Sequence, residues 1–461
     1  MAEYYPLVIL VLGMITVIGL IVGLRLNAFL ALIIAAILVS LLAPGEPGTK
    51  ISRVAEAFGS TAGSIGIVIA LASIIGKAMM DSGAADRIVR GFLSLLGEER
   101  GPVALLSSGY VLGIPVFFDT VFYLLVPLAR SMYRRTRRNY LLYLMAIGAG
   151  GAITHTMVPP TPGPLVLAET LGIDLGVMIL MGAVIALPCA ITGLTFAKWL
   201  DHRMPVHLSA DEPAVPQPDF APAPVLPALL PSLLPIVLPV LLISANTLVT
   251  SLQDAPGASP MWAEIAPYSA LFGNSNLALL LSAFVALWLY WSQRRPSRDE
   301  IAAMTEESLM SGGVIILITA AGGAFGAMLR EAQIGPAIQN LFSGNLTGSP
   351  VMLLLLGFGI SSLLKTAQGS STVAMITASA MLSAMLAQAG PLPFHMVYLA
   401  TAIASGSLVV SWMNDSGFWI YTKMGGLTVT QGLKSWTSVL LVLGFTGLLV
   451  TILLALVFPL A

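Results

Sequence analysis

Charged residues are scarce in this chain. Of its 461 residues, 9% are charged and 57% are hydrophobic, whereas a typical soluble domain has about 25% charged and about 45–50% apolar residues. A water-soluble fold of ordinary shape cannot bury so much apolar surface, so the composition excludes a soluble enzyme and a disordered scaffold. The 21 Lys and Arg residues balance 22 Asp and Glu residues, and this balance leaves no basic surface for nucleic acid.

Cysteine is almost absent as well. The single cysteine, Cys189, excludes an intramolecular disulfide and a multi-cysteine metal site, and we expect it to be a small core residue. No second His or Cys lies near His155 in the sequence, so we expect no metal site there. We also expect no cofactor. The opening sequence MAEYYPLVIL also lacks the positive region of a secretory signal. We therefore expect this segment to be retained as a membrane helix.

Long apolar runs are abundant. A membrane-spanning helix needs about 20 mostly apolar residues. Such runs lie at 6–24, 26–43, 62–80, 139–156, 173–197, 226–250, 274–292, 309–329, 393–411 and 436–458. Two further apolar stretches, 102–130 and 350–388, have small or polar residues near their middle, and we interpret them as re-entrant helical hairpins. The predicted fold class is an all-α polytopic membrane protein.

A proline-rich segment divides the chain nearly in half. Residues 201–225 combine many prolines with acidic residues and few aliphatic ones, a composition typical of an extended, solvated linker. We interpret residues 1–200 as a first repeat, residues 201–225 as a cytoplasmic linker and residues 226–461 as a second repeat.

The two halves resemble each other at a nearly constant offset. Gly76 and Asp81 match Gly326 and Glu331, 250 residues later. At an offset of 251, residues 115–120 fall on 366–371 and residues 159–164 fall on 410–415. Each half then holds five spans and one hairpin, with broken helices at mid-membrane. Two halves with an odd number of crossings have to be inverted relative to each other, which is a recurrent transporter architecture.

The distribution of positive charge predicts the orientation. With both termini outside, 16 of the 21 Lys and Arg residues lie in inside loops, and only Lys50, Arg53 and Arg330 lie outside. Lys77 and Lys365 lie at membrane depth. This bias follows the positive-inside rule. We therefore expect a multi-pass protein of a lipid bilayer with both termini periplasmic.

Two motifs in the first half place polar groups at membrane depth, where ionisable residues are costly and usually functional or paired. In GIPVFFDT, Pro115 breaks a helix, and we favour proton or hydroxyl binding by Asp119 over a simple capping role. In THTMVPPTPGP, His155 is a candidate proton relay, with a neutral imidazole bonded to helix backbone as an equal alternative. The loop of this second motif contains Pro159, Pro160, Pro162, Gly163 and Pro164.

Two motifs in the second half are their counterparts. In KTAQGSSTVA, backbone N–H groups at a helix start attract anions, and Lys365 adds a charge for a carboxylate, unless it snorkels to an interface. In NDSGFW, Asp415 is a second candidate protonation site, unless it only forms a turn that ends a helix. The predicted substrate-binding residues are Thr120, Thr154, Lys365, Gly369, Ser370, Ser371, Thr372 and Asn414.

The four motifs resemble those of the gluconate permease family, the gluconate:proton symporters of the ion-transporter superfamily. The matching segments are IPVFFDT at 114–120, His155 with PPxPGP at 159–164, QGSSTVA at 368–374 and NDSGFW at 414–419. The resemblance covers nearly the whole chain. Two positions depart from the family pattern, namely Thr161, where a histidine is expected, and Lys365, where an arginine is common.

The resemblance implies import of sugar acids with protons across the bacterial inner membrane. It also implies a homodimer with a scaffold part and a moving part that holds the hairpins. Together with this resemblance, the residues lead to the hypothesis of a secondary transporter, working by alternating access, for a small hydroxylated monocarboxylate such as gluconate. A di- or tricarboxylate carrier or a sodium-coupled carrier is the alternative. A membrane-embedded enzyme that uses His155 and Asp119 is less favoured, because the sequence shows neither a nucleophile nor a metal cluster.

Overall fold

The regular structure of this protein is helical throughout the part that the computed structural model describes, namely residues 5–24, 26–97, 100–206, 226–253, 259–333, 350–386, 392–413 and 415–460. The first half contains α1 (Tyr5–Ile18), π-helical η2 (Gly19–Gly23), α2 (Ala28–Leu42), the short 3₁₀ helix η3 (Pro47–Thr49), α3 (Ser52–Asp81), α4 (Ala84–Leu96), α5 (Gly101–Leu112), α6 (Phe118–Thr136), α7 (Tyr140–Met157), α8 (Pro162–Thr170) and α9 (Leu175–Arg203). The second half contains α10 (Leu229–Gln253), α11 (Pro260–Phe272), α12 (Ser275–Arg294), α13 (Arg298–Glu331), α15 (Pro350–Gln368), α16 (Ser371–Leu386), α17 (Met396–Gly406), α18 (Ser416–Met424), α19 (Val429–Gly432), π-helical η5 (Leu433–Thr437) and α20 (Ser438–Val457). The prediction of an all-α membrane protein is confirmed.

Seven of the described helical segments are long and apolar enough to cross a membrane. They are Pro47–Asp81, Tyr140–Thr170, Leu175–Arg203, Leu229–Gln253, Ser275–Arg294, Arg298–Glu331 and Val429–Val457. Each overlaps a predicted span, and several extend beyond it, since Pro47–Asp81 begins before residue 62 and Tyr140–Thr170 continues past residue 156. Helices α1, α2 and α17 also fall on predicted spans but are shorter. The predicted span 393–411 extends beyond the observed helix, because α17 ends at Gly406 and the chain turns over the following residues.

Two helices were not expected from the search for apolar runs. Helix α4 lies between Gly83 and Gly97, whose φ angles are 78° and 77°, a conformation that favours glycine. Its buried side includes Ile88 and Val89, while Arg90 on another face is exposed. A helix with one apolar face has no continuous apolar run, so only its 3.6-residue periodicity predicts it. Helix α11 is short and has no buried residue.

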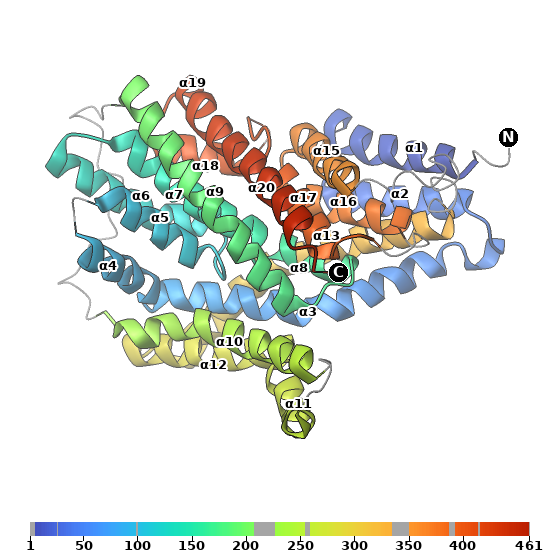
Figure 1. Ribbon diagram of the computed structural model, residues 1–461, viewed down its shortest axis with the longest axis horizontal. Helices are drawn as coiled ribbons and strands as arrows, with labels where there is room; N and C mark the ends of the chain where they lie inside the picture. The colour runs from blue at the N-terminus through green and yellow to red at the C-terminus, as the bar shows by residue number, and fades with distance from the viewer. Residues whose placement is uncertain are drawn as a thin grey trace.

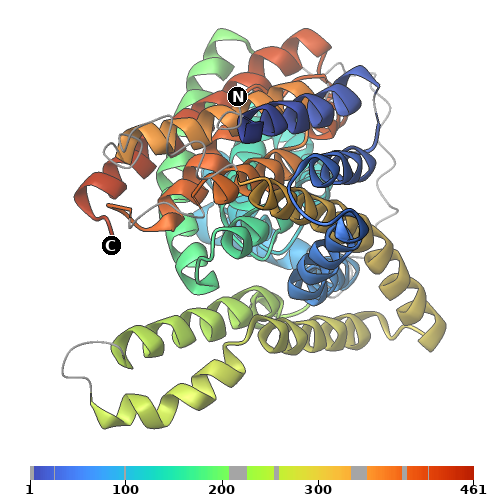
Figure 2. The same ribbon diagram turned by 90° about the vertical axis from the view of Figure 1, so that its right-hand side faces the viewer.

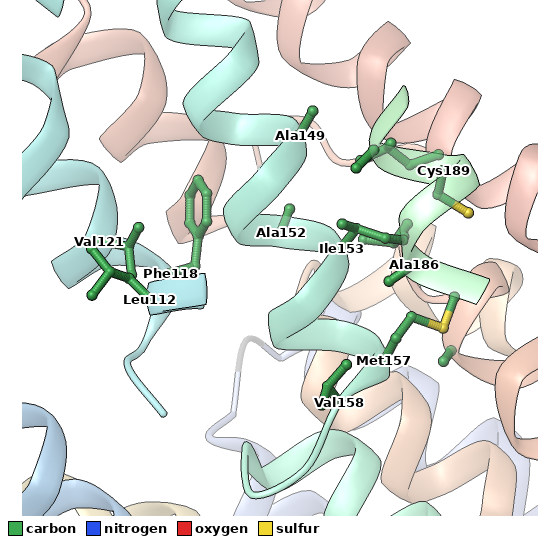
Figure 3. Close-up of a cluster of buried hydrophobic side chains, with 14 of the residues drawn as sticks. Leu112, Phe118, Val121, Ala149, Ala152, Ile153, Met157, Val158, Ala186 and Cys189 are labelled. Carbon is green, nitrogen blue, oxygen red and sulfur yellow. The ribbon is translucent and has the colours of Figure 1, made fainter. Parts of the chain in front are cut away.

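Helix α7 forms the centre of the molecule. In the Tyr140–Thr170 segment 94% of the most apolar window is buried inside the protein, against 28% for Leu229–Gln253. Figure 3 shows Ala152 and Ile153 of α7 lying between Leu112 of the first hairpin and Ala186 and Cys189 of α9. Cys189 is fully buried and free, as the sequence predicts. A helix buried on all sides has to be apolar on all sides, which explains the uniform composition of α7.

Helices α10, α11 and α12 form a layer along one side of the molecule (Figures 1 and 2). Helix α10 packs against α12, α9 and α4. The outer surface of the layer carries large exposed apolar side chains, such as Leu241, Phe284 and Trp288. Because lipid tails are as apolar as leucine, this surface suits the acyl chains of a bilayer.

Four interruptions divide otherwise apolar segments into pairs of half-helices. The first predicted hairpin consists of α5 and α6 with a break at residues 113–117, and the second consists of α15 and α16 with a break at residues 369–370. The remaining breaks separate α7 from α8 and α17 from α18. Gly369 has a φ of 90°, which an L side chain rarely adopts. The chain thus breaks at all four sequence motifs.

Contacts between helices recur in matched pairs across the two halves. Helix α5 packs against α7 as α15 packs against α17, and α6 packs against α18 as α16 packs against α8. In each half a glycine permits backbone contact with the hairpin. A Cβ on Gly150 would lie 2.2 Å from the carbonyl oxygen of Leu106, and one on Gly406 would lie 2.3 Å from that of Phe358. This pairing agrees with a repeat, while its inversion across a membrane stays a prediction.

Candidate functional site

A cavity of about 460 Å³ lies where the four breaks meet. Its lining residues come from all four motifs and from α13, η5 and α20, and they are Phe117, Phe118, Asp119, Ala152, His155, Thr156, Pro162, Ile315, Gly369, Ser370, Ser371, Thr372, Leu408, Asp415, Ser416, Gly417, Trp436 and Leu440. Small-molecule sites commonly enclose about 300–1,000 Å³. The cavity therefore has the size of a site for a small solute.

Four helix N-termini face this cavity. Helix α6 begins at Phe118, α8 at Pro162, α16 at Ser371 and α18 at Ser416, and all four residues line the cavity. The first N–H groups of a helix have no partner within the helix, and each N-terminus carries roughly half a positive charge. Converging N-termini therefore favour an anion in the cavity.

The turn of the second hairpin is fixed on both sides. The backbone N–H of Gly369 donates to the carbonyl of Lys365 over 2.8 Å, and the Ser371 hydroxyl donates to the carbonyl of Ser407 over 2.8 Å. The hydroxyl of Ser370 accepts the N–H of Val373, as expected for a residue that caps a helix. The N–H groups of Ser371 and Thr372 are at the helix positions without an intrahelical partner, so they are the groups of this turn best placed to bind an anion.

Lys365 does not face the cavity. Its side chain is 1% exposed, and its Nζ donates to Asp415 Oδ2 over 2.7 Å and also to the carbonyl of Gly369. Asp415 lies on the cavity wall with its side chain 12% exposed, and its Oδ1 accepts the N–H of Gly417 over 3.0 Å. The structure thus joins two residues that the sequence assigned to separate roles, and the charge of each is balanced by the other.

Asp119 is the second carboxylate on the cavity wall, and it is exposed. It lies in the first turn of α6. None of the ion pairs formed between described residues involves Asp119. His155 also lines the cavity, with its ring edge-on to Phe117 at a centroid distance of 6.0 Å. Its Nδ1 is buried without a hydrogen-bond partner in the described part of the chain.

Other predicted site residues lie around the cavity without lining it. Thr154 is buried and donates to the carbonyl of Gly150 inside α7. Gly163 packs against α16, where a Cβ would meet Met375 at 2.0 Å. Asn414 lies outside the described residues. The cavity lining also does not include Thr120, Pro115, Pro159, Pro160 or Pro164. Pro115, Pro159 and Pro160 lie in the breaks. The prediction that Pro162, Gly163 and Pro164 belong to the loop is wrong, because they form the first turn of α8, where proline is tolerated.

Several wall residues were not expected from the sequence. Phe117 and Phe118 belong to the first motif, and their adjacency to Asp119 is the signal that could have indicated them. Trp436 lies 25 residues beyond Ser411, to which its Nε1 donates over 2.8 Å. Its ring lies 5.0 Å from that of Phe118. Nothing in the sequence separates Trp436 from the six other tryptophans, because its role depends on tertiary packing.

The site and the fold together define a class of protein. Half-helices whose N-termini meet around a cavity, inside a bundle of apolar spans, are typical of transporter binding sites. In the described part of the chain, no three His, Cys, Asp or Glu side chains cluster as a metal site would require.

The chain belongs to the GntP permease family, because the family model described as GntP family permease matches residues 5–457. The inner membrane permease YgbN of Escherichia coli K12 is 33% identical over 448 residues, which cover 95% of this chain and 96% of that protein. A gluconate permease of Pseudomonas aeruginosa is 32% identical over 452 residues, covering 96% and 97% of the two chains. The low-affinity gluconate transporter of E. coli K12 is 29% identical over 428 residues, covering 92% and 93%.

Two solved structures share the fold. The YdaH transporter of Alcanivorax borkumensis superposes with a TM-score of 0.63 at 15% identity, covering 94% of this chain and 98% of that chain. MtrF of Neisseria gonorrhoeae, described as one of a class of antimetabolite efflux pumps, superposes with a TM-score of 0.62 at 13% identity, covering 94% of each chain. The predicted resemblance to the gluconate permease family is confirmed, and the chain is a multi-pass membrane protein.

Proposed function

We propose that this protein imports gluconate or a closely related sugar acid together with a proton. The observation that carries the proposal is the convergence of four helix N-termini on one cavity whose wall also holds a carboxylate without an ion-pair partner among the described residues. Relatives named gluconate permease and gluconate transporter support the choice of substrate.

The substrate carboxylate binds at the start of α16 in this proposal. Ser371 and Thr372 line the cavity with N–H groups that have no acceptor within α16, and the dipole of α16 favours negative charge there. Lys365 acts from behind the Gly369 turn, by holding the turn in place rather than by direct contact with the substrate, since Asp415 occupies its Nζ. Polar groups of the wall, including the Ser370 hydroxyl and the His155 ring, receive the hydroxyl groups of the sugar acid.

Asp119 carries the coupled proton. Lys365 and Asp415 balance each other, so Asp119 is the uncompensated negative charge on the wall. An ionised Asp119 repels the substrate carboxylate across the cavity, and protonation removes that repulsion. Proton and substrate then each strengthen the binding of the other by the same factor. His155, which lies on the same wall, is the second group that binds and passes on the proton.

The two halves act as inverted repeats in this transport cycle. The matched helix contacts of the two halves support a repeat, and exposure of the cavity on either side follows when one part moves against the other. The protein acts as a homodimer in the bacterial inner membrane, with both termini in the periplasm and residues 201–225 as the cytoplasmic linker.

Uptake of labelled gluconate into proteoliposomes with an imposed pH gradient, acid outside, tests this proposal. We expect the wild type to accumulate gluconate. Asp119→Asn should lower gradient-driven accumulation about tenfold or more, because coupling free energies of about 1–3 kcal/mol correspond to about 5–150-fold effects. The same variant should still exchange labelled for unlabelled gluconate without a gradient, because exchange requires no net proton movement.

The matched control is Asp299→Asn. Asp299 is the second residue of α13 as Asp119 is the second residue of α6, and it is exposed and outside the cavity lining. Equal accumulation by Asp119→Asn and the wild type would overturn the proton assignment. Accumulation driven by a sodium gradient alone would reassign the coupling ion, and accumulation of a di- or tricarboxylate instead of gluconate would reassign the substrate.

A further inference from the structure

The carboxylate of Asp415 accepts hydrogen bonds from three directions. Its Oδ2 accepts from Lys365 Nζ over 2.7 Å and from the Ser411 hydroxyl, and its Oδ1 accepts from the N–H of Gly417 over 3.0 Å. All three partners are donors. An ionised carboxylate satisfies each contact, whereas a proton on Oδ2 would displace either Lys365 or Ser411.

Lys365 transmits this arrangement to the second hairpin. Lys365 is buried in α15, four residues before Gly369. Its Nζ donates both to Asp415 and to the carbonyl of Gly369. Removing one partner of a buried ion pair leaves the other uncompensated, which is strongly unfavourable. The Gly369 turn and the start of α18 are therefore held together by one ammonium group, and this bond fixes where the N–H groups of Ser371 and Thr372 point.

Ser411 and Trp436 extend the chain of hydrogen bonds to the aromatic wall. Trp436 Nε1 donates to the Ser411 hydroxyl over 2.8 Å, and that hydroxyl donates to Asp415. The indole lines the cavity between Tyr421 and Phe118, with both centroid distances at 5.0 Å. Trp436 belongs to a π-helical turn, η5, a feature that is frequent at functional sites.

We propose that Ser411 and Trp436 are positioning residues of the substrate site. They direct Asp415 onto Lys365 and so hold the Gly369 turn in its anion-binding form, and Asp415 stays ionised through the transport cycle instead of carrying the coupled proton. This inference rests on the proposed function. Of the two carboxylates on the cavity wall, only Asp119 then carries the coupled proton.

Equilibrium binding of gluconate to the purified full-length protein, measured by calorimetry at two pH values, tests the positioning role. We expect Ser411→Ala and Trp436→Phe each to weaken binding about tenfold, the effect of losing a hydrogen bond in a chain that ends on a charged group. The double variant should bind no more weakly than Ser411→Ala, because both substitutions interrupt one chain. The pH dependence of binding should match the wild type.

Ser405→Ala is the control, because Ser405 is also fully buried but donates within α17 to Thr401 and does not line the cavity. Trp436→Phe keeps a ring against Phe118 and Tyr421, so it provides a folded variant even if Ser411→Ala is unstable. Unchanged affinity in Trp436→Phe, or additive losses in the double variant, would overturn the inference. So would an Asp415→Asn variant that binds gluconate with wild-type affinity but without pH dependence. Failure of the wild type to bind gluconate would instead overturn the proposed function.

Discussion

At the scale of single residues, partners decide what a carboxylate in this cavity can do. Asp119 and Asp415 both lie at the start of a half-helix on the cavity wall. Asp415 has a buried lysine and two further donors, whereas Asp119 takes part in none of the ion pairs formed within the described residues. The sequence offered both as proton sites on equal terms, since a side chain's neighbours across the fold are not visible in it.

Thr161 shows how one hydroxyl supports a broken helix. It is buried, and its hydroxyl lies 2.8 Å from the carbonyl of His155 and 2.7 Å from that of Val158. These carbonyls belong to the end of α7, where no helical N–H follows to satisfy them. The family resemblance suggested a histidine at this position, and the threonine here serves the backbone of the break.

Thr161→Val should therefore destabilise the protein. The isosteric valine leaves both carbonyls without this donor, and a buried unsatisfied group costs about 1–3 kcal/mol. Thermal unfolding of the purified protein should show a lower Tm, with gluconate uptake reduced because His155 sits on the same turn. Thr161→Ser keeps the hydroxyl and should retain both properties. A Thr161→Val variant as stable as the wild type would contradict this account.

At the scale of helices, the breaks are the most predictable part of the fold. Pro115 and the prolines at 159–164 cannot continue a helix, and Gly369 has the positive φ that favours glycine. The prolines indicated two of the breaks from the sequence alone, the small and hydroxylated residues of KTAQGSSTVA indicated the tip of the second hairpin, and the polar residues of NDSG indicated the break before α18. Helices α4 and α11 were missed because the search followed apolar runs of membrane length, and neither helix is such a run.

Glycines that permit backbone contact between helices should not tolerate a methyl group. A Cβ on Gly406 of α17 would lie 2.3 Å from the carbonyl oxygen of Phe358 of α15. Backbone cannot move aside as a side chain can, so Gly406→Ala should lower the Tm by more than a typical core substitution, which costs about 1–3 kcal/mol when overpacked.

Gly359→Ala is the matched control for that substitution. Gly359 is the neighbour of Phe358 on the same helix, and nothing lies within 4 Å of a Cβ placed there. Because alanine is a better helix former than glycine by roughly 1 kcal/mol, this variant should be as stable as the wild type or more stable. Equal Tm values for the two variants would show that α15 and α17 separate more easily than the structure indicates.

At the scale of the whole molecule, the two halves should lie in opposite orientations across the membrane. The loop before α3 and the loop before α13 occupy corresponding places in the halves. Glu46 in the first loop and Arg298, the residue of α13 that directly follows the second loop, are exposed. The positive-inside rule assigns the first loop to the outside and the second to the inside.

Cysteine labelling tests this topology directly. In a Cys189→Ala background, Glu46→Cys should react with a membrane-impermeant maleimide in intact cells, whereas Arg298→Cys should react only after the membrane is opened. Labelling of both sites from the same side would contradict inverted repeats. The unsubstituted background protein, whose one buried cysteine has been replaced, should show no labelling.

The sequence by itself determined that this protein resides in a membrane, where its helices break and which polar residues interrupt its apolar segments. These properties are local, because each depends on residues that are close together in the chain. This holds for the burial of an apolar segment, for the break of a helix at proline and for a charge placed in lipid. Tertiary structure decided that Lys365 pairs with Asp415, that Trp436 joins the site through Ser411, and that four helix N-termini share one cavity. Such relations join positions up to about 300 residues apart, and only packing of the helices brings them together.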